Sequence, residues 1–359
     1  MSNARELAQI PSTPSGRRNL IINGAMNVAQ RGTSITNFTV NNQYHTVDRF
    51  IYEAGGISSV DFAQVTDAPS GFKKSLKATL NGTFTPSAGQ YFIPFEHRIE
   101  SQDVVFLDYG TANAKTVTLS FWIKSNKTGT YVVEFSNASI NRKWSQSYTI
   151  NAANTWEQKI ITWTGDTGAG TSFTDDSGIG ATFFWWMSGG TTFTSGSLSG
   201  AWQDGNNADR AVGVPSSLAD DDQFYLTGVQ LEVGTVATEF EHRSFGEELQ
   251  LCQRYYYELN NTDDFRYVAG LTGRSTNTAY SMGQLHMTPM RTSPSVSSLG
   301  LAVYRGDIWR DVTATGAGAG RYGWGFNPNF ATDSGCTDGT ALMLYLNAIP
   351  SYIKFDAEL

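Results

Sequence analysis

Alternating apolar and polar positions dominate the chain from residue 58 to residue 187. Turns rich in Gly, Asn and Pro separate the alternating segments. A period of two places successive side chains on opposite faces of a β-strand. Eight such segments occur, at residues 58–65, 75–80, 91–96, 116–124, 130–135, 144–150, 156–163 and 181–187. So many short antiparallel strands over this span predict a β-sandwich.

One segment has a helical period. Residues 245–258 follow Ser244, which is a suitable N-cap, and the first turn carries Glu247 and Glu248 near the positive end of the helix dipole. The apolar stripe of this predicted helix consists of Leu249, Cys252 and Tyr256. An apolar stripe needs a partner surface, either in its own domain or in another subunit.

The last hundred residues return to strands and loops. The strand signals lie at residues 266–271, 279–287 and 341–349, and a Gly-rich run separates the last two. We therefore expect four parts in the chain. They are an extended arm at 1–16, a β-sandwich domain at 17–243, a linking helix at 244–259 and a smaller β-domain at 260–359.

Composition supports a turn-rich β protein. Charged residues make up 16% of the chain, aromatic residues 13%, and Gly occurs 36 times. The formal net charge of -8 disfavours binding to nucleic acid or to anionic lipid. We see no apolar run long enough to cross a bilayer and no secretory signal core in the first fifteen residues. We therefore expect neither nucleic-acid binding nor membrane insertion.

Several linked motifs resemble the tail-fibre and receptor-binding proteins of tailed bacteriophages. They are NLIINGAM at 19–26, QRG at 30–32, YHTVDRF at 44–50, YLTGVQLEVG at 225–234, ATEFEHRS at 237–244, EELQLCQRYY at 247–256, PMRTSPSV at 289–296 and FDAEL at 355–359. The resemblance covers nearly the whole chain from Asn19 onward. The order of strands in the first domain is similar to that of jelly-roll carbohydrate-binding modules. The expected fold is thus all-β, a jelly-roll β-sandwich followed by a short helix and a second smaller β-domain.

The resemblance implies a non-enzymatic virion protein that attaches to the phage tail and recognises glycans on the host surface. It also implies a homotrimer, with the linking helix on the three-fold axis, that is assembled in the host cytoplasm and carried on the virion tail. The expected partners are two further copies of the chain, a tail adaptor, nozzle or other virion protein, and a host surface glycan. The alternative is a purely structural virion protein, such as a head fibre, a capsid decoration or a protein associated with the tail adaptor.

The first sixteen residues are predicted to dock onto the virion. This arm is polar apart from Leu7 and Ile10, which would make the apolar contacts. Arg5 and Glu6 would form the polar rim of the docking site.

Catalytic and metal-binding motifs are weak in this sequence. Asp175 and Asp176 are adjacent on a loop, which is not the arrangement of two carboxylates across a sugar groove, so we expect no enzyme activity. We expect no organic cofactor, and the candidate ligands for a structural Ca²⁺ are Asp220, Asp221 and Asp222. The two cysteines, Cys252 and Cys336, are expected to be free thiols in a reducing cytoplasm.

Aromatic residues in polar loops are the candidates for sugar binding, because a sugar ring stacks on an aromatic ring while polar side chains bond its hydroxyls. The candidates in the first domain are Trp202, Asp204, Asn206, Asn207 and Arg210. Those in the second domain are Arg321, Tyr322, Trp324 and Asn327. Trp202 and Trp324 have an alternative interpretation as rings buried under their own loops. Trp185 and Trp186 are adjacent on a strand, so one must face outward, where a neighbour covers it or a ligand can reach it.

Overall fold

The computed structural model describes residues 17–137, 142–261, 266–275, 278–281, 288–305, 308–316, 329–332, 341–347 and 350–359. The chain divides into two compact units, which we describe separately. Unit 1 comprises Met1–Glu248 together with Leu359, and unit 2 comprises Leu249–Glu358. The predicted docking arm, with Arg5, Glu6, Leu7 and Ile10, lies outside the described residues.

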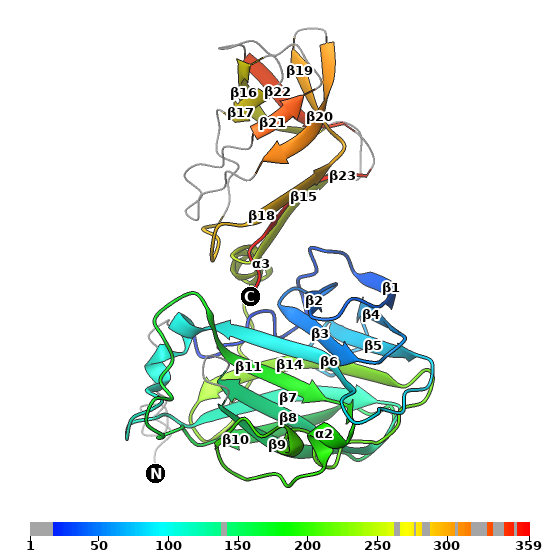
Figure 1. The fold of residues 1–359 in the computed structure, drawn as a ribbon, viewed down its shortest axis with the longest axis vertical. Coiled ribbons are helices and arrows are strands. Elements are labelled where there is room, and N and C mark those ends of the chain that lie inside the picture. Colours follow the sequence, from blue (N-terminus) through cyan, green and yellow to red (C-terminus); the bar gives the residue numbers. More distant parts are fainter. Residues whose placement is uncertain are drawn as a thin grey trace. The chain divides into compact units, whose positions relative to one another are not determined.

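Unit 1 is a sandwich of two antiparallel sheets (Figure 1). The six-stranded sheet has the order β1 (Ser34–Phe38), β4 (Ser59–Val65), β5 (Ser75–Asn81), β14 (Gln223–Val233), β7 (Val117–Ser125), β10 (Glu157–Trp163). The eight-stranded sheet has the order β13 (Gln203–Asp204), β9 (Arg142–Ile150), β8 (Gly129–Asn137), β11 (Ile179–Trp186), β6 (Tyr91–Glu100), β3 (Phe50–Gly55), β2 (Gln43–Tyr44), and β12 (Ser188–Gly189) also pairs with β6. All eight strands predicted from the alternating pattern form, within two residues at the start of each.

The main core lies between the two sheets and is built from one side of each alternating strand. From β7 it takes Leu119, Phe121 and Ile123, and from β11 it takes Phe183 and Trp185. The opposite side chains of the same strands face away from the core, as a period of two requires. The prediction of an all-β jelly-roll sandwich followed by a short helix and a smaller β-domain is confirmed.

A second small core covers part of the outer face of the eight-stranded sheet. Trp185 belongs to the main core, whereas Trp186 faces outward and is nevertheless only 1% exposed. Residues of the segment from α2 (Thr191–Thr194) to residue 214 cover it, among them Phe193, Ala211 and Val214. Trp186 is therefore covered by a neighbouring segment of its own chain.

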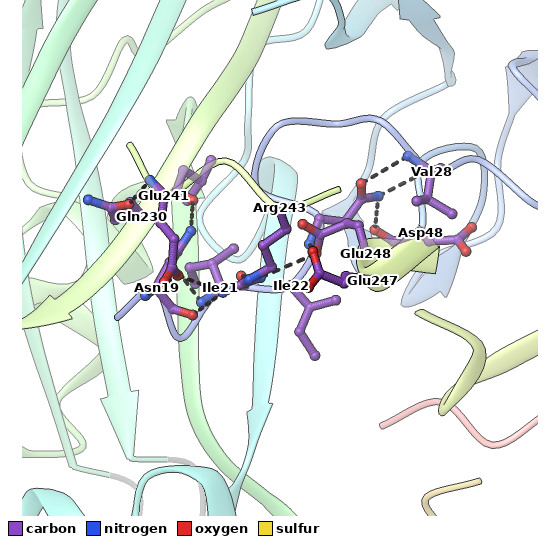
Figure 2. Close-up of polar contacts among 12 residues, drawn as sticks. Asn19, Ile21, Ile22, Val28, Asp48, Gln230, Glu241, Arg243, Glu247 and Glu248 are labelled. Carbon is purple, nitrogen blue, oxygen red and sulfur yellow. Dashed lines mark hydrogen bonds and ion pairs between the residues drawn. The ribbon is translucent and has the colours of Figure 1, made fainter. Parts of the chain in front are cut away.

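The motif residues near the N-terminus form a buried polar network within unit 1 (Figure 2). Asn19 accepts hydrogen bonds from the backbone N–H groups of Ile21, at 2.9 Å, and Leu231, at 3.0 Å. The side-chain amide of Asn23 donates to the backbone carbonyl oxygens of Val28, at 2.8 Å, and Asp48, at 3.0 Å. These two asparagines replace the sheet hydrogen bonds that an irregular segment cannot make itself.

Three charged side chains complete this network from the C-terminal end of unit 1. Arg243 donates to the carbonyl oxygen of Ile21 at 3.0 Å and lies 3.3 Å from a carboxylate oxygen of Glu248. Glu248 accepts from the backbone N–H of Asn23 at 2.6 Å, and Glu241 accepts from that of Asn19 at 2.8 Å. These residues, which belong to the motifs, thus connect the N-terminal segment of unit 1 to its C-terminal segment.

The helix is shorter than predicted. α3 spans Phe245–Gln253, and Ser244 and Glu247 form reciprocal side-chain to backbone bonds at its start, at 3.3 and 2.9 Å. Tyr256 lies in strand β15 (Tyr256–Asn261), paired with Asp356, so the prediction of a helix to residue 258 is wrong. Tyrosine favours strands, and pairing along the whole of β15 outweighs a few more residues of helix.

The predicted trimer stripe on this helix is also revised. Cys252 is 0% exposed and Tyr256 is 3% exposed within the chain itself, and Leu249 is half-buried. These side chains therefore already have partners in their own subunit.

Unit 2 combines a three-stranded sheet with a closed barrel (Figure 1). The sheet has the order β15, β23 (Ser351–Asp356), β18 (Ser295–Leu299). The barrel has the order β16 (Arg266–Ser275), β17 (Thr278–Ser281), β21 (Asn329–Thr332), β20 (Ile308–Gly316), β19 (Leu301–Arg305), β22 (Ala341–Leu346). Alternate residues of β22, namely Leu342, Leu344 and Leu346, are buried in its core. Among the described helices of both units, none has the length and apolar character of a membrane span.

Candidate functional site

The structure separates the sugar-binding candidates predicted in the first domain. The Trp202 indole packs edge-on against Phe135, at a centroid distance of 4.8 Å, and against Tyr109, at 5.5 Å. Its Nε1 donates to the carbonyl oxygen of Thr164 at 2.7 Å. Trp202 is thus a half-buried ring that packs against the main core.

The neighbouring polar candidates mainly shape their own loop. Asp204 pairs with Arg142 at 2.9 Å, and its side chain is 91% exposed. The side chain of Asn206 accepts from the backbone N–H of Ala208 at 3.1 Å and so caps the short 3-10 helix η3 (Asn207–Asp209). Asn207 is exposed as the first residue of that helix. These contacts do not gather the three side chains around a common ligand position.

Arg210 lies on the other side of the eight-stranded sheet from Trp202. Its Nε and Nη2 atoms donate to the two carboxylate oxygens of Glu134, at 2.8 and 2.7 Å. The guanidinium group also lies over the rings of Trp186, at 4.7 Å, and Phe184, at 5.5 Å. The bidentate ion pair with Glu134 and the stacking of the guanidinium on aromatic rings hold the arginine in one orientation.

A second arginine pair lies on the same face. Glu134 of β8 pairs in register with Phe184 of β11, which in turn pairs with Glu96 of β6. Arg98 donates through Nε to Glu96 at 2.5 Å, and its Nη2 lies 3.7 Å from Glu53 of β3. We define the charged face as the outward-facing group that these contacts link, which consists of Glu53, Glu96, Arg98, Glu134, Phe184 and Arg210.

Burial controls the electrostatics of the charged face. Glu96 is 0% exposed, and this burial raises its pKa to about 8, although Arg98 opposes the shift. Burial also raises the pKa of Glu53, against the opposing effects of Arg98 and Arg210. The Oε2 atom of Glu96 is buried and has no hydrogen-bond partner within the described ranges. Burial therefore favours the protonated form of Glu96, whereas the Arg98 guanidinium beside it favours the carboxylate.

Sequence reasoning found only Arg210 among the residues of the charged face. Glu134, Glu96 and Arg98 occupy the polar positions of alternating strands, which ordinarily face solvent. The signal that could have singled them out is the Glu-x-Arg-x-Glu run at 96–100, three charged residues on one face of a strand.

The predicted calcium ligands bond to separate partners. Asp220 accepts from the backbone N–H of Gly82 at 2.7 Å, and Asp222 accepts from that of Ala219 at 2.8 Å. Asp221 accepts from the Gln223 side chain at 2.8 Å. Within the described part of the chain, no three His, Cys, Asp or Glu side chains lie together in a group that could hold a metal ion. The three aspartates therefore do not fit a Ca²⁺ site, which needs several oxygens around one point.

Other predicted residues lie outside the described ranges. They are the second-domain candidates Arg321, Tyr322, Trp324 and Asn327. Cys336 also lies outside them, while Cys252 is buried in unit 2. The redox state of the two cysteines stays a prediction.

No protein-family model and no curated protein matches the chain. Among solved structures, it is similar to the enzymatically active domain of bacteriophage CBA120 tailspike protein 4, with a TM-score of 0.32 and 13% identity over 60% of this chain. The chain spans only 21% of that tailspike chain. It is also similar to TmCBM61 in complex with β-1,4-galactotriose, with a TM-score of 0.30, 10% identity and coverage of 61% of this chain and 100% of that one.

A third similar structure is the family 11 carbohydrate-binding module from Clostridium thermocellum in complex with a β-1,3-1,4-mixed-linked tetrasaccharide. Its TM-score is 0.29, at 12% identity over 57% of this chain and 99% of that one. Likenesses at this level of identity and TM-score concern chain architecture, so the function of this protein has to be argued from its own residues.

Proposed function

We propose that this chain recognises carbohydrates, as a receptor-binding subunit of a phage tail, and that the charged face is its sugar-binding site. The observation that carries the proposal is the setting of Phe184. Its ring is half-buried in the middle of an eight-stranded sheet, between Glu134 and Glu96 in register. An arginine joined to a carboxylate lies on each side of it. Sugar sites combine these features, a flat apolar surface and polar groups around it.

The polar groups of the face suit hydroxyl groups, which both donate and accept hydrogen bonds. Arg210 and Arg98 supply donors, and Glu53 supplies an acceptor. Burial and pairing fix these side chains before a ligand arrives, so little rotamer entropy is lost on binding.

We propose binding without hydrolysis. A carboxyl group with a raised pKa beside a second carboxylate is also the equipment of a glycosidase. Here, however, Arg98 contacts both Glu96 and Glu53, so these two groups share one cation on the same face of the sheet. That geometry favours recognition over attack from two sides of a glycosidic bond.

The assignment to a phage tail rests on the linked motifs from residue 19 to residue 359. We propose that the subunit acts as a homotrimer attached through its N-terminal arm to a tail adaptor, nozzle or other virion protein. Three weak sugar sites on one particle then act by avidity, which raises the effective affinity without new contacts. A purely structural virion protein is the alternative, and sugar binding separates the two.

The test is a microarray of bacterial surface polysaccharides probed with the purified full chain. We expect specific spots for the wild type and their loss in Phe184→Ala, because that variant removes the flat ring without changing any charged residue of the face. Phe72→Ala is the matched control, since Phe72 is half-buried too but packs on Phe240 and His242 away from the charged face.

Two results would count against the proposal. Binding by Phe184→Ala at the wild-type level would exclude the charged face as the site. Release of new reducing ends from a bound polysaccharide would show that the protein hydrolyses its ligand. Glu96→Gln should then abolish that release.

A further inference from the structure

The outer surface of the unit 2 barrel gathers aromatic rings on adjacent strands. In the register of β20, β19 and β22, Trp309 lies opposite Tyr304, and Tyr304 lies opposite Met343. One step along the same strands, Asp311 lies opposite Ala302, and Ala302 lies opposite Tyr345. Residues two apart on a strand share a face, so both rows lie on one side of the barrel wall. The other side of β22 holds the buried leucines.

The rings of this surface contact one another and remain accessible. Trp309 lies 4.7 Å from Tyr304 and 5.1 Å from Tyr345, measured between ring centroids, and Trp309 is 43% exposed. Ala302, in the middle, is 0% exposed because the larger side chains around it cover it. We call this group, formed by Tyr304, Trp309 and Tyr345, the aromatic face.

A cavity of about 320 Å³ lies near the aromatic face, between residues of the same three strands and their ends. Its lining consists of Gly300, Leu301, Asp311, Val312 and Asn347. Asp311 stands two residues from Trp309 on β20, and Asn347 stands two residues from Tyr345 at the end of β22. The Oδ1 atom of Asn347 is buried and has no hydrogen-bond partner in the described part of the chain. A buried carbonyl oxygen of this kind gains stability from any donor that reaches it.

We propose that the aromatic face and this cavity form a second sugar-binding site, which takes an uncharged pyranose unit. The ring of the sugar stacks on Trp309, and its hydroxyl groups bond to the Asp311 carboxylate and the Asn347 amide. The volume lies at the lower end of the range for small-molecule pockets and suits a single sugar unit rather than a long chain. The carboxylate of Asp311 repels anionic sugars, so the proposed ligand bears hydroxyl or acetamido groups.

This site is independent of the charged face, because its residues belong to the other unit. A chain with one site in each unit would bind a polysaccharide at two points, which slows its release. Experiment can therefore disprove sugar binding at the second site without disproving it at the charged face, and the reverse is also true.

The test uses full-length protein labelled with 5-fluorotryptophan and observed by ¹⁹F NMR, with the Trp309 signal assigned through Trp309→Phe. The probes are the methyl glycosides of glucose, galactose, mannose and N-acetylglucosamine, titrated through the millimolar range expected of weak sugar sites. We expect one of them to shift the Trp309 signal in a saturable way while the signal of Trp156, in unit 1, stays in place.

Variants distinguish a specific sugar-binding site from nonspecific contact of the sugar with the protein surface. Asp311→Asn and Asn347→Ala should each raise the dissociation constant of the glycoside at least about tenfold, as expected when a central polar contact is lost. Asp175→Asn, an exposed carboxylate in unit 1, should leave it unchanged. Phe184→Ala should also leave it unchanged, which distinguishes this site from the charged face.

Two outcomes would overturn the inference. One is the lack of a saturable Trp309 shift with all four glycosides. The other is a shift that follows protein concentration and not sugar, which would identify the aromatic face as a contact between copies of the chain.

Discussion

At the scale of residues, Arg210 neutralises the buried carboxylate of Glu134 and also contacts aromatic rings. Glu134 is 0% exposed, and the Arg210 guanidinium donates one hydrogen bond to each of its carboxylate oxygens. A buried carboxylate without its partner is costly, because the protein replaces water poorly around it. The side chains proposed to bind sugar are therefore also needed for stability.

Arg210→Ala should lower the free energy of unfolding by about 3–5 kcal/mol, the usual cost of leaving one charge of a buried pair alone. Arg210→Lys keeps the charge but loses the bidentate geometry, so it should lower the free energy of unfolding by less. Urea unfolding followed by tryptophan fluorescence measures both. Equal stability of Arg210→Ala and the wild type would contradict the burial of this pair.

Glu96 should make stability depend on pH. Its pKa is about 8 in the folded chain and near 4.5 when unfolded, so between these values the folded state holds a proton that the unfolded state has lost. The free energy of unfolding should therefore fall as pH rises from 5 to 8. Glu96→Gln should flatten this dependence and be the more stable form at pH 9. Urea titrations of both proteins at several pH values measure this dependence. If the free energy of unfolding of Glu96→Gln changes with pH as steeply as that of the wild type, the role of Glu96 is refuted.

Trp202→Ala should behave as a core substitution. The half-buried ring packs against the main core and bonds to Thr164, so its removal should cost at most about 3 kcal/mol, the lower end of the range for fully buried tryptophan. Sugar binding at the charged face should survive, since Arg210 lies on the other side of the sheet. A folded Trp202→Ala variant that loses sugar binding with unchanged stability would restore Trp202 as a ligand contact.

At the scale of elements, strands with strict alternation were predictable and short or polar strands were not. β4 to β11 carry regular apolar positions, whereas β1 and β18 consist largely of Ser, Thr and Asn and depend on their partners. The helix was predicted too long because Tyr256 continues its period, although the same residue pairs in β15. The candidate site was largely missed for a related reason. Glu96 and Glu134 look like solvated strand residues until their pairing with Arg98 and Arg210 is seen.

The start of α3 offers a further test at this scale. Ser244 and Glu247 cap each other, so Ser244→Ala should cost about 1 kcal/mol of local stability. Hydrogen exchange of the α3 backbone amides should rise accordingly, while exchange in the core strand β7 stays constant. Equal changes in β7 would show that the cap stabilises the whole of unit 1.

At the scale of the whole molecule, the proposal of a homotrimer rests on the motif resemblance, since the helix stripe is covered within the chain. We expect light scattering to give about three times the mass of one chain, 39.2 kDa. Phe245, which is 59% exposed beside the helix start, is a candidate contact between subunits, and Phe245→Ser should weaken assembly. A mass near 39.2 kDa for the wild type would remove trimerisation and the avidity argument with it.

The central claim is that the charged face of unit 1 binds sugar through Phe184 and its flanking ion pairs. The most direct measurement is calorimetric titration of the full chain with an oligosaccharide from the polysaccharide that binds on the array, comparing the wild type, Phe184→Ala and Phe72→Ala. We predict that Phe184→Ala weakens binding at the unit 1 site at least about tenfold, with the melting temperature close to that of Phe72→Ala. Wild-type affinity in a folded Phe184→Ala protein would contradict the claim.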